Sequence, residues 1–101
     1  MANAEHLWLV PVDLPAFAGH FPGRPIVPGV VLLDQALRFA QALCDRHGVG
    51  WQVGNAKFLS PVAPGETLRF TLSLTPRGSV AFGVTCGERV VASGSLIPPA
   101  A

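Results

Sequence analysis

An imidazole, a backbone amide and a carboxylate that could act together occur between residues 20 and 34 of the sequence. His20 stands in a segment rich in glycine and proline, and its imidazole can exchange a proton near neutral pH. Gly29 ends that segment at the expected start of a helix, where unpaired amides attract negative charge. Asp34 lies inside the expected helix and can protonate or orient a hydroxyl group. These residue types fit acid–base chemistry on a carbonyl compound that develops negative charge.

Each of these three residues also has a purely structural interpretation. A histidine in a proline-rich loop, such as His20, is more often a hydrogen-bonded structural residue than a base. Asp34 precedes Arg38 by four residues, a spacing at which the two side chains can pair on a solvated helix face. Helical periodicity places Asp34 at the edge of the apolar stripe rather than inside it. Gly29 fits a simple helix-entry residue, so residue types and spacing alone leave both interpretations open.

The elements that would position these residues follow from the hydrophobic periodicity. A helix with an unusually wide apolar stripe is expected over residues 30–47, with Arg46 and His47 in its last turn and Gly48 as its C-terminal cap. Residues 15–29 are expected to be irregular, because proline and glycine disrupt helices and sheets. A period of two marks the expected strands, at residues 6–10, 51–59, 67–74, 79–86 and 89–97. The sequence predicts an α+β fold, with one long helix on a curved antiparallel sheet of about five strands, in a single domain spanning residues 1–101.

Composition restricts the partners and the compartment that we expect. The formal net charge is +1 and charged residues make up 13% of the chain, about half the usual share of roughly 25%. This balance argues against a nucleic-acid groove or a polybasic membrane patch. A small domain so poor in polar residues is expected to bury apolar surface against a second copy of itself. Cys44 and Cys86 are not at metal-ligand spacing and fit free thiols of a cytoplasmic protein. The sequence also contains no apolar stretch long enough for a membrane helix.

Two motifs resemble a known enzyme family. The segment from Gly19 to Gly29, GHFPGRPIVPG, resembles the signature of the β-hydroxyacyl-acyl carrier protein dehydratases of fatty acid synthesis, which have the hotdog fold. The segment from Lys57 to Glu66, KFLSPVAPGE, is similar to a strand-turn motif of the same family. The motifs occur in the family's order, and the length of the chain resembles that of the short dehydratases of aryl polyene pathways.

The resemblance implies a reaction, a set of roles and an assembly. The reaction is dehydration of a β-hydroxyacyl thioester to a trans-2-enoyl thioester, with the substrate on the phosphopantetheine arm of an acyl carrier protein. His20 would be the base, Asp34 would act on the leaving hydroxyl, and the Gly29 amide would polarise the carbonyl. The sites would lie at a homodimer interface, where His20 of one subunit faces Asp34 of the other, and no metal or organic cofactor would be needed. The residues expected to contact the substrate are Phe21, Pro28, Val30, Leu33 and Leu37.

Other interpretations stay open beside this one. Most members of the family carry glutamate where this chain has Asp34, although aspartate occurs in the dehydratase that also isomerises the double bond and in the aryl polyene group. Asp34 alone does not predict isomerase activity. The same fold would suit an acyl-thioesterase in which Asp34 activates water, but such an enzyme has no need of His20 as a base for a C–H bond. It would also suit a non-catalytic acyl-binding subunit of a heterodimer, against which the presence of both His20 and Asp34 argues.

Overall fold

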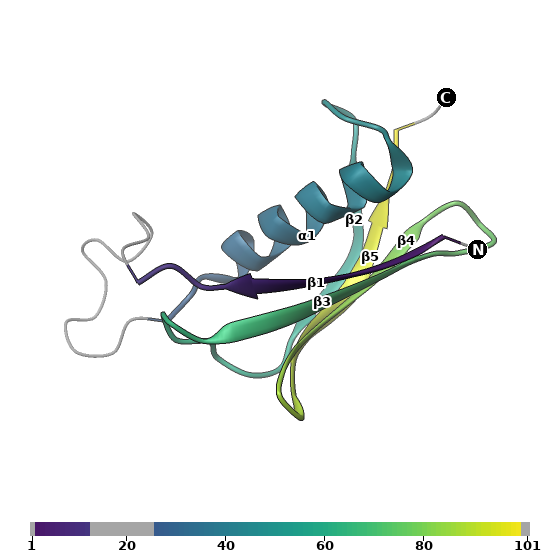
Figure 1. Ribbon diagram of the computed structural model, residues 1–101. Coiled ribbons are helices and arrows are strands. Elements are labelled where there is room, and N and C mark those ends of the chain that lie inside the picture. The colour runs from purple at the N-terminus through teal and green to yellow at the C-terminus, as the bar shows by residue number, and fades with distance from the viewer. Residues whose placement is uncertain (1, 13–25, 100–101) are drawn as a thin grey trace.

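The computed structural model describes residues 2–12 and 26–99, and these ranges contain one helix and five strands. All strand pairs are antiparallel, and the order across the sheet is β1-β3-β4-β5-β2. The elements are β1 (Asn3–Leu9), α1 (Gly29–Cys44), β2 (Gln52–Phe58), β3 (Thr67–Leu74), β4 (Val80–Cys86) and β5 (Arg89–Ile97). The predicted α+β hotdog architecture is confirmed, because a single helix lies along a curved five-stranded antiparallel sheet (Figure 1).

The hydrophobic pattern of each element explains which face it buries. Along β3, Leu68, Phe70 and Leu72 are buried while the residues between them are exposed, so one face of the sheet points inward. In α1, Leu32, Ala36 and Ala40 recur every four residues and are buried against that face. The two alanines leave little side chain between helix and sheet, which allows the helix to lie close to the strands.

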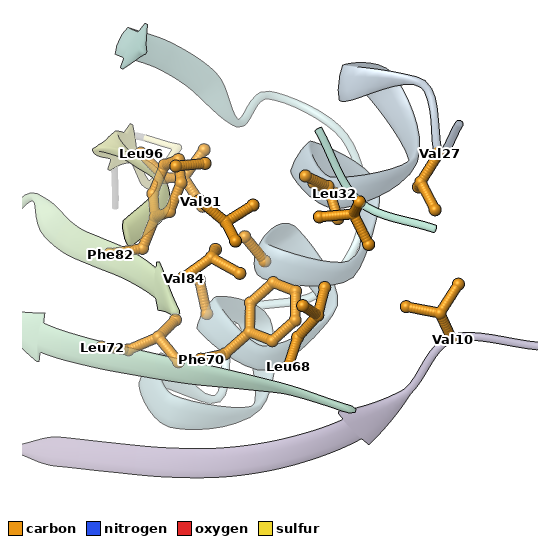
Figure 2. Close-up of a cluster of buried hydrophobic side chains, with 14 of the residues drawn as sticks. Val10, Val27, Leu32, Leu68, Phe70, Leu72, Phe82, Val84, Val91 and Leu96 are labelled. Atoms are coloured by element: carbon orange, nitrogen blue, oxygen red, sulfur yellow. The ribbon is translucent and has the colours of Figure 1, made fainter. Parts of the chain in front are cut away.

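The core lies between α1 and the concave face of the sheet (Figure 2). Phe70 is at its centre and makes edge-to-face contacts with Phe39 of α1 and Trp8 of β1, at ring-centroid distances of 5.2 Å and 6.1 Å. His6 of β1 stacks on Phe39 with centroids 4.1 Å apart. These contacts attach the helix to the β1 and β3 side of the sheet.

The helix ends earlier than the periodicity predicts. Asp45, not Gly48, takes the left-handed conformation that stops α1, with φ 52° and ψ 42°. The amides of Asp45 and Arg46 then donate to the carbonyls of Ala42 and Gln41, which satisfies the last turn. The prediction of a helix over residues 30–47 with Gly48 as its cap was therefore wrong at the C-terminal end. Aspartate is one of the few residues other than glycine that tolerates this conformation.

The far edge of the sheet is not covered by the helix. Val53 and Phe58 of β2 are 52% and 50% exposed, although they pair with Leu96 and Ala92, which are buried on the concave face. Directly opposed residues in an antiparallel pair share a face, so both side chains point toward the helix side. Between α1 and β2 the concave face is therefore open and apolar. Within the described residues, no helix is both long enough and apolar enough to span a membrane.

Candidate active site

Asp34 lies on the side of α1 that faces away from the core. Its carboxylate accepts a hydrogen bond from Nε of Arg38 at 3.0 Å, and the Asp34 side chain is 57% exposed. The geometry of the single subunit thus matches the i, i+4 ion pair of the structural interpretation. Exposed pairs of this kind contribute only about 0.3–0.5 kcal/mol. The pair with Arg38 therefore costs little to break, and the Asp34 carboxylate is accessible from solvent.

A groove with a volume of about 260 Å³ runs between α1 and the β5–β2 edge, and we call it the Asp34 groove. Its lining residues are Val30, Leu33, Asp34, Leu37, Trp51, Gln52, Val53 and Leu96. Asp34 is the one charged residue among these eight, so its carboxylate borders a mostly apolar groove. Such a combination suits a ligand with an apolar chain and a polar group near one end.

The structure brings together several of the residues that the sequence predicts for the site. Val30, Leu33 and Leu37 line one groove with Asp34 because spacings of three and four residues bring side chains to one side of a helix. Whether they contact an acyl chain stays a prediction. Pro28 immediately precedes α1 in an extended conformation, with φ −61° and ψ 145°. His20 and Phe21 lie outside the described residues.

Gly29 opens a second groove, also of about 260 Å³, which we call the Gly29 groove. Its lining residues are Ile26, Val27, Gly29, Leu32, Phe58, Leu59, Ser60, Pro61 and Val62. Amides in the first turn of a helix have no acceptor within the helix, and Pro28 has no side-chain acceptor to offer. A Cβ at position 29 would lie 2.9 Å from Cζ of Phe58, so glycine allows this ring to approach the helix start closely.

The turn between β2 and β3 forms one wall of the Gly29 groove, and a carboxylate fixes its shape. Glu66 accepts hydrogen bonds from the amide of Ala63 at 2.8 Å, from the guanidinium of Arg89 at 2.8 Å and from the thiol of Cys86 at 3.2 Å. The Ala63 amide first, then Arg89 and Cys86, lower the pKa of Glu66 to about 2. The hydrogen bond to Glu66, together with burial, raises the pKa of the Cys86 thiol.

Glu66 and Arg89 are residues whose role the sequence interpretation missed. Glu66 ends the motif KFLSPVAPGE, so its presence there was a signal that could have been used. Arg89 gave no such signal, because it lies 23 residues further along the chain and meets Glu66 only through the β3–β4 and β4–β5 pairings.

Gly29 and Asp34 do not line the same groove in one subunit. The two residues lie on the same helix, but five positions rotate the direction of the side chain by about 140° at 100° per residue. The Gly29 groove opens toward the β2–β3 turn, whereas the Asp34 groove opens toward β2 and β5. Within the described residues, Gly29 and Asp34 of a single subunit therefore open into two separate grooves.

Two curated proteins with related sequences carry the same activity in their names. The 3-hydroxyacyl-[acyl-carrier-protein] dehydratase FabZ of Rhizobium rhizogenes is 34% identical over 98 residues, which cover 90% of this chain and 61% of the relative. The protein of the same name from Chlamydia trachomatis serovar D is 39% identical over 100 residues, covering 86% of this chain and 65% of the relative. The chain thus spans less than two thirds of the length of these curated relatives.

Solved structures agree in fold along almost the entire chain. The dehydratase heterocomplex ApeI:P from Xenorhabdus doucetiae contains a chain with a TM-score of 0.81 and 25% identity, covering 98% of this chain and 88% of that chain. An uncharacterised protein from Erwinia carotovora subsp. atroseptica has a TM-score of 0.71 and 33% identity, with coverages of 95% and 83%. The model of the ApeI-like family, described as ApeI dehydratase, matches residues 2–95. With nearly its whole length matched, the chain belongs to the ApeI-like dehydratase family.

Proposed function

We propose that this protein removes water from β-hydroxyacyl thioesters and forms trans-2-enoyl thioesters. The observation that carries the proposal is the pair of half-sites on one helix in a chain of a dehydratase family. One half-site offers open amides at Gly29 and the other offers Asp34 beside an apolar channel. A dehydratase needs both, because negative charge develops on the thioester oxygen while a hydroxyl group leaves.

The reaction assigns one task to each group. The Gly29 amide donates to the thioester oxygen, which acidifies the proton at C2. His20 takes that proton, the C2–H electron pair forms the C2=C3 double bond, and the C3–O bond breaks. Asp34 supplies a proton to the departing oxygen, so that water leaves. The role of His20 rests on the motif GHFPGRPIVPG, because the residue lies outside the described ranges.

We further propose that the working unit is a homodimer, in which each substrate site uses both subunits. Two observations support this arrangement. Gly29 and Asp34 line different grooves of one subunit, and a second copy facing the same helix would bring the Gly29 groove of one subunit to the Asp34 groove of the other. The β2 edge also exposes apolar surface at Val53 and Phe58, next to Val30 of α1, which is 69% exposed. A second hotdog subunit of different sequence is the alternative, since the Xenorhabdus relative is described as a heterocomplex.

An acyl carrier protein is the partner that we propose for delivery of the substrate. The support is the name of the FabZ relatives, which act on acyl-carrier-protein-bound substrates. We also propose a cytoplasmic location, because Cys44 and Cys86 are both free thiols, as is usual in a reducing compartment.

The test of the function is an assay of the purified chain with trans-2-enoyl thioesters on an acyl carrier protein, run in the hydration direction. We expect the acyl group to gain the mass of one water, as measured by mass spectrometry, and His20→Ala to abolish the gain while the protein stays folded. Release of free thiol without hydration would instead indicate a thioesterase. Absence of both reactions in the isolated chain, with hydration on adding a second hotdog subunit, would replace the homodimer by a heterodimer.

A further inference from the structure

Glu66 lies outside the set of residues that the reaction uses. Its carboxylate nevertheless accepts more hydrogen bonds than any other carboxylate in the described residues. We propose that Glu66 is a positioning residue that holds the start of α1, and with it the Gly29 amide, in the geometry needed for catalysis. This proposal rests on the proposed function and adds a residue to it. Glu66 lines neither the Gly29 groove nor the Asp34 groove, so it acts through other residues.

The first step of the argument is the turn that Glu66 closes. Its carboxylate accepts from the Ala63 amide at 2.8 Å, and its own amide donates to the Ala63 carbonyl at 3.4 Å. Arg89 donates to Glu66 at 2.8 Å and to the Pro61 carbonyl at 3.4 Å. The Arg89 guanidinium therefore joins both ends of the turn to β5. Charge-assisted hydrogen bonds of this kind are stronger than neutral ones, and the Glu66 side chain is only 26% exposed.

The second step joins the turn to the helix. The carbonyl of Val62, within the turn, accepts from the amide of Val27 at 2.8 Å. Val62 and Val27 are 1% and 5% exposed, so this hydrogen bond lies in the core and is shielded from water. Val27 stands two residues before Gly29, and Pro28 between them has a restricted φ. A shift of the turn is therefore transmitted to the first amide of the helix.

The third step is the groove itself. Pro61 and Val62 line the Gly29 groove, so the turn that Glu66 closes is also the wall opposite the helix start. The same turn is attached to the residue after β1. The amide of Val10 donates to the carbonyl of Glu66 at 2.9 Å, and the amide of Gly65 donates to the carbonyl of Val10 at 2.9 Å. Loss of the Glu66 carboxylate would thus loosen one wall and the amide that faces it. A misplacement of about 1 Å at a reacting centre can reduce the rate about a hundredfold.

The chain offers a matched control for this carboxylate. Glu5 of β1 pairs with Arg69 of β3, so it is also a glutamate paired with an arginine across strands. The Glu5 side chain is 55% exposed. In the described residues its side chain accepts from Arg69 alone, whereas Glu66 also holds a backbone amide. Glu5→Ala therefore removes a similar ion pair without touching the turn.

The experiment measures kcat and KM for hydration of an enoyl thioester, and hydrogen exchange of the Val27 amide, in Glu66→Ala, Glu66→Gln and Glu5→Ala. For Glu66→Ala we expect kcat to fall about tenfold to a hundredfold with KM within about twofold, because the Gly29 amide acts mainly in the transition state. Exchange at Val27 should accelerate at least about tenfold relative to amides in the middle of β3. Glu66→Gln keeps an acceptor for Ala63 and should show a smaller loss, while Glu5→Ala should change neither quantity by more than about twofold.

Unchanged kcat or unchanged Val27 exchange in Glu66→Ala would overturn the positioning role, and so would equal losses in Glu5→Ala. If Glu66→Ala does not fold, Glu66→Gln and Arg89→Met carry the same comparison with the same expected direction. A wild-type protein that neither hydrates nor dehydrates thioesters would overturn the proposed function instead. In that case Val27 exchange alone still decides whether Glu66 holds the helix start.

Discussion

The concave face of the sheet is covered by the helix near β1 and β3 but is open near β2. On the β1–β3 side, α1 packs against the strands, and Leu68 and Phe70 are fully buried. On the β2 side, Val53 and Phe58 face the same way but remain about half exposed. The covered side supplies the packed core on which stability depends. The open side contains the Asp34 groove, so the surface that the fold leaves uncovered is the one that we propose for the substrate and for a second subunit.

The largest expected effect is a loss of activity on the open side, with almost no change in stability. Asp34→Asn should lower kcat/KM for hydration of an enoyl thioester by about 10²–10⁴-fold, because in the proposed reaction Asp34 exchanges a proton with the hydroxyl. The free energy of unfolding should change by less than about 0.5 kcal/mol, since only the exposed pair with Arg38 is lost. Steady-state kinetics and urea denaturation measure the two quantities.

Asp45→Asn is the matched control for that substitution. Asp45 lies at the other end of the same helix, its side chain is 98% exposed, and asparagine tolerates its left-handed backbone. Its activity should equal that of the wild type. Activity of Asp34→Asn within about threefold of Asp45→Asn would remove Asp34 from the catalytic set.

The next effect contrasts the same truncation on the two sides. Phe70→Ala should cost about 3–5 kcal/mol of unfolding free energy, because Phe70 is fully buried between Trp8 and Phe39. At protein concentrations low enough for the subunit to be a monomer, Phe58→Ala should cost about half as much or less, because half of its side chain is exposed in the single subunit. Urea denaturation at one protein concentration compares them, and equal costs would contradict the division into a covered and an open side.

A charge on the open edge tests the assembly. Val53→Asp places a carboxylate on the apolar concave face of β2, which is costly to bury at an interface. We expect the protein to sediment as a monomer and its activity to fall with dimer content. Glu88→Gln, on the β4–β5 turn, should leave the sedimentation unchanged. A dimer that persists in Val53→Asp would place the interface elsewhere.

The smallest effect is a pH dependence at the turn beside the Gly29 groove. The pKa of Glu66 is lowered from 4.5 to about 2, so the folded state favours the carboxylate. Its contribution to stability is complete above pH 4.5 and is lost as the pH falls toward 2. Wild-type stability should therefore decline more steeply than that of Glu66→Gln between pH 4.5 and 2, as measured by thermal unfolding in a pH series. Parallel curves would show that Glu66 has an ordinary pKa in the folded protein.

Local patterning predicted most of the fold. The strands expected at residues 67–74 and 89–97 have these bounds in the structure, because their alternation and flanking turn residues are strong local signals. The helix start was predicted within one residue, and the end was wrong by three. That error has a physical cause: an aspartate in the left-handed conformation stops the helix before the glycine, and sequence patterns do not show which of the two residues ends the helix.

The wide apolar stripe of α1 shows where local patterning stops being informative. The stripe contains both Leu32 and Val30, yet Leu32 is 3% exposed and Val30 is 69% exposed. One part of the stripe faces the core and the other lines the Asp34 groove. Periodicity identifies apolar residues on a helix, but only the placement of the sheet decides which of them are covered.

The sequence by itself determined the order of elements, the spacing that puts Asp34 beside Val30 and Leu37, and the two motifs that indicate a dehydratase family. These depend on neighbours along the chain, through helical and strand periodicity. Tertiary structure alone decided that Gly29 and Asp34 open into different grooves, and that Arg89 reaches Glu66 from 23 residues away. The reason is that strand pairing and helix placement bring together residues whose separation in sequence carries no local signal.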